Sequence, residues 1–236
     1  MRAPSAAVTG PAASPAAAPA PASGGVTAAL TAAVTAPTRT PPRGHALALD
    51  DTGWTFSGPG AVPVRDAATL EIRADRGADL FAMPGFHEAS GVPLLGRTLT
   101  GDHTVRTRVA VRGGAFGDAG GILVHGADGW FKVCVERTRA GTWAVVTVVS
   151  RPLSDEAVGP ALAGPCAELL VTREGGRHAV FCREDPDGPW LFVRTFLGPA
   201  DAEVRLALFA QAPFSDACTA VFTAVRWSPR ALADRR

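Results

Sequence analysis

Lys132 and Glu136 place two opposite charges four residues apart in the stretch GWFKVCVER, residues 129–137. The stretch has the length and the Val/Phe content of a β-strand. Because strand side chains alternate between two faces, the even-numbered residues from Trp130 to Glu136 share one face, and the Phe and Val residues share the other. Two opposite charges on one face either form an ion pair at an open surface or line a pocket, where a carboxylate beside a lysine is suited to acid–base chemistry.

The Phe/Val face of this strand is expected to form the core, so the charged face points outward. In a sandwich of curved sheets, an outward face can be the concave side on which ligands bind. Lys132 is the only lysine of the chain, whose other cationic side chains are arginines. We therefore predict catalytic or binding roles, with Glu136 as general acid/base and Lys132 as its polarising partner; an ion pair on an open face is the alternative.

Six further residues are candidates for ligand contact: Asp118, His125, Trp130, Ser154, Asp155 and Trp190. The tryptophans offer flat faces that pack on sugar rings, with core or edge packing as the alternative. The histidine follows the preceding apolar run and is otherwise a structural or surface residue. Asp118 either caps a turn or reaches the pocket rim, and the same alternatives hold for Ser154 and Asp155, which we expect in a loop.

Complete signatures of known catalytic sites are missing from the sequence. Retaining glycosidases need two carboxylates about 5–5.5 Å apart, and no Glu-x-Asp-x-x-Glu pattern supplies them, although a pair from separate strands such as Glu136 with Asp155 stays open. The five histidines are scattered without HxH or HxxxH spacing. We find no GxSxG, P-loop or GxGxxG motif, and we predict no metal and no cofactor.

The four cysteines, Cys134, Cys166, Cys182 and Cys218, include no CxxC pair, which argues against a structural zinc site or a thioredoxin-type motif. Two of them, Cys134 and Cys182, fall inside apolar strand-like runs. Cysteine is among the residues most often buried. We therefore expect buried free thiols.

Residues 44–236 carry the pattern of one β-rich domain. Ten apolar runs of strand length are separated by Gly, Pro and Asp, and no window of 11 residues has a helical stripe. The runs cover residues 68–74, 103–111, 120–125, 129–137, 143–150, 167–174, 177–184, 189–196, 203–211 and 218–227. Glycine-containing turns predict a meander of hairpins from about residue 103 to 196. The pattern predicts an all-β antiparallel sandwich or jelly roll, with a closed barrel as the alternative.

The first 43 residues are nearly all Ala, Pro, Thr, Ser, Gly and Val, and we predict a disordered tail. Prolines interrupt the apolar region that a secretory signal needs, so we expect a cytoplasmic protein, with a poorly formed export signal as the alternative. No segment approaches the ~20 apolar residues that span a bilayer. A formal net charge of +1 without basic runs argues against nucleic-acid binding. The oligomeric state is not predicted.

Several short motifs resemble those of a bacterial and fungal family of unknown function that is named "regulation of enolase protein 1-like". They are DLF (79–81), DAGGILV (118–124), WFKVCVE (130–136), the Ser154–Asp155 pair, and the hairpin and closing strands up to Trp227. Cys134 stands where that family usually has glycine, and Glu156 stands where it has tryptophan. The resemblance covers Trp54 to Trp227 and implies a concanavalin-A-like sandwich, a fold shared with lectins and laminarinases.

Three functions are compatible with these observations. The first is a ligand-binding protein that takes a carbohydrate or small metabolite on a concave face, around Asp118, His125, Trp130, Lys132, Glu136 and Asp155. The second is an enzyme that acts on a sugar or specialised metabolite in the same pocket through Glu136 and Lys132. The third is a non-catalytic protein-interaction module with the Pro/Ala tail as a docking arm.

Overall fold

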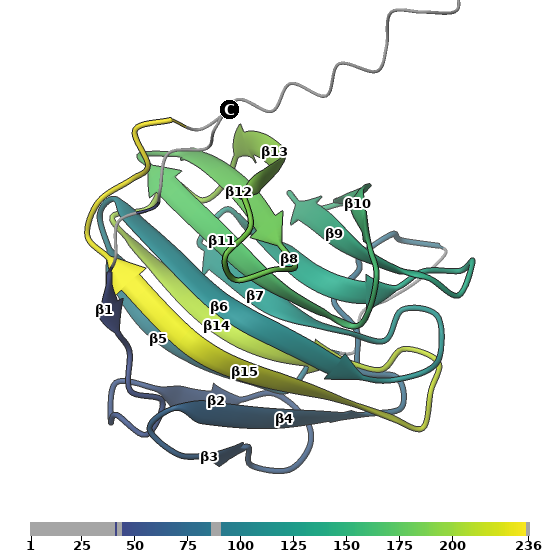
Figure 1. The fold of residues 1–236 in the computed structure, drawn as a ribbon. Helices are drawn as coiled ribbons and strands as arrows, with labels where there is room; N and C mark the ends of the chain where they lie inside the picture. Colours follow the sequence, from purple (N-terminus) through teal and green to yellow (C-terminus); the bar gives the residue numbers. More distant parts are fainter. Residues whose placement is uncertain (1–40, 42–43, 86–90, 235–236) are drawn as a thin grey trace, which may run out of the picture. The chain divides into compact units, whose positions relative to one another are not determined.

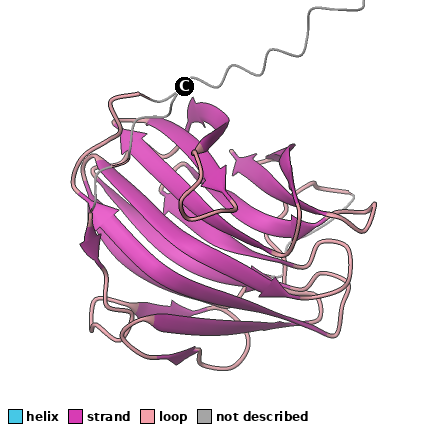
Figure 2. Ribbon diagram, in the orientation of Figure 1, coloured by secondary structure: helices cyan, strands magenta, loops and turns pink. Residues whose placement is uncertain are grey.

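A computed structural model of the chain describes residues 41, 44–85 and 91–234. These residues belong to the larger of two units into which the chain divides, residues 37–236. The predicted tail, residues 1–43, lies outside the described part apart from residue 41. The described residues form strands, turns and loops but no helix (Figure 2), and hence no helix that could span a membrane. The all-β prediction is confirmed.

Two antiparallel sheets pack face to face (Figure 1). The eight-stranded sheet has the order β13 (Leu191–Leu197), β12 (Arg177–Arg183), β11 (Cys166–Glu174), β6 (His103–Arg112), β15 (Ala217–Ser228), β4 (Thr69–Asp75) and β3 (Val64–Arg65), with β1 (His45–Ala46) also paired to β15. The seven-stranded sheet has the order β10 (Ser154–Leu162), β9 (Trp143–Ser150), β8 (Gly129–Arg137), β7 (Ala119–Gly126), β14 (Glu203–Gln211), β5 (Leu94–Thr100) and β2 (Thr55–Ser57). This arrangement is the predicted antiparallel sandwich of the jelly-roll type.

The predicted strands agree with the structure best where the apolar pattern is regular. Strands β8, β9 and β14 have the predicted bounds. The pattern missed β5 and β10, whose residues include Gly96 in one and Gly159 with Pro160 in the other. Proline removes a backbone donor and is tolerated on an edge strand, which is where β10 lies.

The predicted single meander is wrong in one respect, since it divides between the two sheets. Strands β7 to β10 form one meander in the seven-stranded sheet, and β11 to β13 form another in the eight-stranded sheet. Turns alone do not show which sheet a strand joins, because that choice depends on which faces can pack together.

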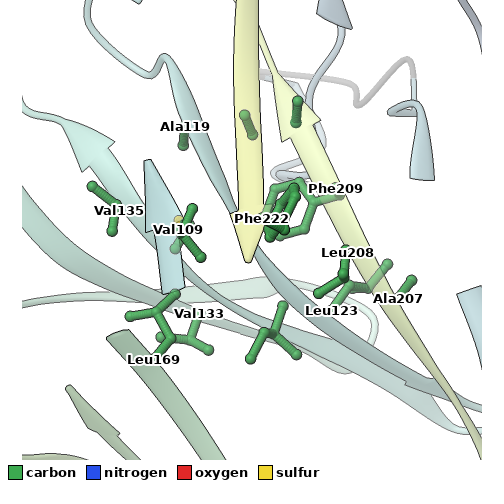
Figure 3. Packing of buried hydrophobic residues seen from close by; sticks show 14 of the residues in the cluster. Val109, Ala119, Leu123, Val133, Val135, Leu169, Ala207, Leu208, Phe209 and Phe222 are labelled. Carbon is green, nitrogen blue, oxygen red and sulfur yellow. The ribbon is translucent and has the colours of Figure 1, made fainter. Parts of the chain in front are cut away.

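The core lies between the sheets and receives one face of most long strands, β10 being an exception. On β8 this is the predicted face, where Phe131, Val133 and Val135 are fully buried. Figure 3 shows side chains of both sheets in this interior, among them Val109 and Phe222 of the eight-stranded sheet. Close approach demands small residues in places: a Cβ on Gly120 would lie 2.3 Å from the Cβ of Ala220.

A row of buried polar side chains closes one end of the core. His103, Arg173 and His178 lie directly opposite one another on β6, β11 and β12. The ring of His178 packs edge-on against Phe131 at 4.7 Å between centroids. His103 Nδ1 bonds the carbonyl of Gly101 at 2.9 Å, and His178 Nε2 bonds that of Pro199 at 3.1 Å. Burial, assisted by the nearby Arg173 charge, lowers the pKa of both histidines to about 4.

This row predicts acid-sensitive stability. An unfolded histidine has a pKa near 6.5, whereas the two folded histidines have pKa values of about 4. Between these pH values the unfolded state binds more protons than the folded state. The free energy of unfolding therefore falls as the pH falls through this range. We expect a loss on the order of 2 to 3 kcal/mol for each histidine once the pH is below 4. Urea unfolding at pH 7.5 and at pH 4.5 measures the effect.

Two choices isolate the contribution of the histidines. The pKa of Glu136 is raised to about 7 in the folded protein, so this residue makes the fold more stable as the pH falls, opposite to the histidines. The measurement therefore uses the Glu136→Gln protein as background. In that background, the double variant His103→Asn/His178→Gln keeps a donor at each bonded position but cannot titrate. Its stability should change much less between the two pH values, and an equal acid loss would contradict the assignment. His45→Ala, which removes an exposed histidine, is the control.

Candidate functional site

The outer face of the seven-stranded sheet, away from the core, is hollowed by a pocket of about 390 Å³. This volume lies within the range of small-molecule sites, ~300–1,000 Å³. The lining combines a charged floor with aromatic walls and comes from Asp79, Phe81, Phe116, Gly117, Lys132, Glu136, Arg139, Glu156, Gln211, Pro213 and Phe214. Strand pairing brings these groups to one face, because residues directly opposite each other point the same way.

Lys132 is the charge at the floor of the pocket and is only 2% exposed. Its Nζ donates a hydrogen bond to Oε1 of Gln211 at 2.8 Å and lies 3.9 Å from Oδ1 of Asp79. The Gln211 amide is itself fixed, since its Nε2 donates to the carbonyl of Gly117 at 2.8 Å. A buried ammonium needs such compensation, because burial without partners costs several kcal/mol.

Glu136 lies four residues further along β8 than Lys132, on the same face, and is 6% exposed. Burial raises the pKa of its carboxyl group to about 7, an effect that Lys132 reduces and Glu156 adds to. The thiol of Cys134 donates to Oε2 of Glu136 at 3.6 Å. Burial also raises the pKa of that thiol well above its ordinary value, so Cys134 remains a protonated donor. At neutral pH, Glu136 therefore exchanges readily between its acid and its carboxylate form.

A crossing segment, residues 78–82, runs over this outer face. At one end Ala78 pairs with Ala212, just beyond β14. At the other end the N–H of Ala82 donates to Oγ of Ser154 at 2.9 Å, and the N–H of Ser154 donates to the carbonyl of Ala82 at 3.0 Å. Between these anchors, Asp79 and Phe81 line the pocket. The segment therefore supplies both the second charge at Lys132 and part of the aromatic wall.

Aromatic rings form the mouth of the pocket. The rings of Phe116 and Phe214 stack with their centroids 5.5 Å apart and an interplanar angle of 12°. The guanidinium of Arg139 lies 4.3 Å from the centre of the Phe116 ring, a cation–π arrangement. Phe214 is 51% exposed, so its ring offers a flat apolar surface beside the polar floor.

The structure brings Lys132 and Glu136 into one pocket on the outer face of the sheet. Both side chains are buried, and the cation pairs with Gln211 and Asp79 across the site. The simple alternative, an ion pair at an open surface, is therefore wrong. Their chemical roles stay predictions.

Ser154 and Asp155 were expected in a loop, and the structure instead places them at the start of β10. Strand alternation then separates them. Ser154 shares the outer face and anchors the crossing segment, whereas Asp155 points to the other side, where it pairs with Arg194 at 2.7 Å. It is Glu156, two residues after Ser154, that lines the pocket.

Asp118 and Trp190 do not line the pocket. Asp118 is fully buried and accepts hydrogen bonds from the N–H groups of Gly114 and Ala115 and from Oγ of Ser215, so it caps the loop before β7. Trp190 is buried in a separate apolar cluster, with a guanidinium 4.6 Å from its ring centre. The structure thus places both residues as their structural alternatives had them: Asp118 caps a turn and Trp190 packs in a core.

His125 and Trp130 share the outer face and lie directly opposite each other on β7 and β8. They do not line the pocket of Glu136. His125 lines a neighbouring hollow on the same face, and Trp130 is half-buried next to it in the strand register.

Sequence reasoning missed several pocket residues, chiefly Asp79, Gln211, Phe116 and Phe214. Asp79 had a signal, because it opens the DLF motif that supports the family resemblance. Gln211 ends an apolar run whose pattern is otherwise that of core, and nothing local distinguishes it. The two phenylalanines come from loops whose meeting depends on the fold alone.

Neither metal nor thiol chemistry gains support at this site. Within the described ranges, no group of three or more His, Cys, Asp or Glu residues is arranged to hold a metal ion. The four cysteines are free, three of them buried and Cys166 partly so.

The raised pKa of Glu136 predicts that this residue destabilises the fold at alkaline pH. The folded carboxyl titrates near pH 7 and the unfolded one near 4.5, so the free energy of unfolding falls as the pH rises through this window. Relative to the wild type, Glu136→Gln should gain stability from pH 5 to pH 8, on the order of 2 to 3 kcal/mol. Denaturant unfolding at both values checks this, with the exposed Glu203→Gln as control; a gain independent of pH would contradict it.

Comparisons with known proteins agree with the architecture. A structure of a functionally unknown protein from Saccharomyces cerevisiae matches with a TM-score of 0.68 at 19% identity, over 75% of this chain and 96% of that one. A mutant of the GH43 protein BlXynB from Bacillus licheniformis matches with a TM-score of 0.57 at 13% identity, over 74% of this chain and 36% of that one. A Bacteroides ovatus protein, xyloglucan PUL GH43B, matches with a TM-score of 0.55 at 14% identity, over 75% and 37%.

These likenesses show the fold alone, and the chain spans about a third of the length of the GH43 proteins. A search of curated proteins found no match. The name "regulation of enolase protein 1-like" and the concanavalin-A-like relationship stay predictions. Residues 54–230 match the family described as "Protein of unknown function (DUF1349)", so the chain belongs to the DUF1349 family.

Proposed function

We propose that the protein binds a small carbohydrate in the pocket of Lys132 and Glu136. The observation that carries this proposal is the combination, in one cavity of about 390 Å³, of an aromatic wall and a fixed polar floor. A sugar ring has apolar C–H faces and a rim of hydroxyl groups. Phe116 and Phe214 offer apolar surface to the C–H faces of the ring. The polar floor offers hydrogen-bond partners to its hydroxyl groups.

The polar groups are arranged to meet both donors and acceptors. The Lys132 ammonium has three protons, and the bond to Gln211 uses one of them. Glu136, near the midpoint of its titration at neutral pH, can either accept or donate a hydrogen bond. Hydroxyl groups also do both, so they match this floor better than groups that only accept or only donate.

The charges of the pocket favour a neutral ligand. Lys132 and Arg139 contribute two positive charges, and Asp79 and Glu156 contribute two negative ones, while Glu136 is only partly ionised near pH 7. A strongly charged ligand would be attracted by one half of this set and repelled by the other. A polyhydroxylated neutral molecule meets no such conflict.

The DUF1349 family is described as of unknown function, so its name does not indicate a ligand. Two of the similar structures carry names of glycoside hydrolase family 43 proteins, and these likenesses at 13% and 14% identity concern the fold. They are compatible with a sugar ligand, but the proposal depends on the pocket.

A glycan array probed with the full-length protein tests the proposal, with calorimetry on any sugar retained. Phe214→Ala should weaken binding about threefold to tenfold, because it removes apolar contact from a side chain that the fold does not need. Lys132→Met should weaken it further by removing the charged donor. Phe192→Ala, which removes another exposed phenylalanine, on β13, should have no effect. Unchanged binding by Phe214→Ala and Lys132→Met would refute the site.

A second candidate function is catalysis by Glu136, which its pKa near 7 specifically favours. A general acid/base works best when its pKa lies near the working pH. Lys132 is positioned to stabilise the carboxylate form, and two more carboxylates, Asp79 and Glu156, line the same pocket. Such a site is suited to proton transfer to and from a sugar oxygen or carbon.

Turnover of the retained sugar, followed by mass spectrometry, tests this second function. Glu136→Gln should lower the rate by about a hundredfold or more while calorimetric binding persists. Lys132→Arg keeps a cation and should shift the pH dependence of the rate rather than abolish it. Full activity of Glu136→Gln would exclude Glu136 as the acid/base.

A further inference from the structure

We propose that the outer face carries a second binding subsite, across the crossing segment from the first, so that the natural ligand is an oligosaccharide rather than a single sugar. This inference rests on the proposed function and specifies its ligand class. It comes from a hollow on the same face that the Lys132/Glu136 pocket does not include.

The second hollow has a volume of about 470 Å³ and a mostly apolar lining. Its floor is formed by Leu123 and His125 of β7 and by Arg205 and Ala207 of β14. Leu80 of the crossing segment lines one side. Because Leu80 lines this hollow while its neighbours Asp79 and Phe81 line the other pocket, the segment stands between two cavities of similar size.

Three planar side chains form a row on the outer face, and two of them, His125 and Arg205, line the second hollow. Arg205 lies opposite His125 in the pairing of β14 with β7, and His125 lies opposite Trp130 in the pairing of β7 with β8. Residues paired in this way point to the same face with their Cβ atoms about 5 Å apart. His125 is exposed and the other two are partly so. Flat groups side by side suit the faces of successive rings.

The Arg205 guanidinium is held as part of this platform. A Cβ placed on Gly96 would lie 2.5 Å from Nε of Arg205 and 3.1 Å from its Cζ, so the side chain occupies the space over that glycine. Its Nη2 donates to the carbonyl of Thr55 and to Oγ of Ser57, both at 3.2 Å. These bonds fix the guanidinium on the outer face, where it can serve as a surface for a ligand.

The two cavities are close enough for one molecule to occupy both. Leu123, in the floor of the second, lies directly opposite Lys132, in the floor of the first. From Glu136 to Trp130 the face extends over six residues of β8, or about 20 Å at ~3.3 Å per residue. A single sugar ring cannot cover that length, whereas a short chain of rings can.

Calorimetry with β-1,4-linked xylose, glucose and mannose series of one to six units tests the inference. In the series that binds, affinity should rise about tenfold between the shortest ligand that fills the first pocket and the longest. His125→Ala removes an exposed ring, and Gly96→Ala displaces Arg205 from its position. Both should leave the affinity for the short ligand unchanged and remove most of the gain with length. His45→Ala, in the other sheet, is the matched control.

The outcomes separate the two proposals. Phe214→Ala should weaken short and long ligands alike, because both occupy the first pocket. Equal affinity for all lengths, or a gain with length that survives His125→Ala and Gly96→Ala, would overturn the second subsite while the first stands. Absence of binding for every sugar of every length would overturn both.

Discussion

The ammonium of Lys132, buried on the outer face of the seven-stranded sheet, is the constraint around which the site is organised. It is 2% exposed, and a buried cation must be compensated. Gln211 and Asp79 provide that compensation from β14 and from the crossing segment. The Gln211 amide in turn depends on the carbonyl of Gly117. One charge thus fixes the relative positions of a strand, a loop and the segment that covers the face.

The same charge sets the chemistry of Glu136. Burial alone disfavours its carboxylate, and Lys132 offsets part of that cost, which leaves the pKa near 7. A fully solvated glutamate would be ionised at neutral pH, and one buried without a cation would remain protonated far above it. Glu136 is therefore present as both acid and carboxylate near neutral pH, because it is buried and lies near the Lys132 cation.

Much of the fold could be predicted from the sequence, because regular alternation specifies strands and their faces. The alternation of β8 placed Lys132 with Glu136 and set Phe131 in the core. The same rule would have chosen Glu156 over Asp155 had β10 been recognised, but Gly159 and Pro160 obscured it. Gln211 was beyond reach, and only the DLF motif pointed to Asp79, because the partners of a buried lysine are set by sheet order and by a crossing segment that lacks periodicity.

Strand β8 is buried on both faces, and each face is covered by a different part of the molecule. The eight-stranded sheet covers Phe131, Val133 and Val135, while the crossing segment reaches Lys132 on the other side. The first cover is apolar and contributes through buried area. The second adds directed polar contacts, from Asp79 to Lys132 and from Ala82 to Ser154. The directed contacts therefore bound the pocket on one side of β8, while apolar packing on the other side holds the strand in the sandwich.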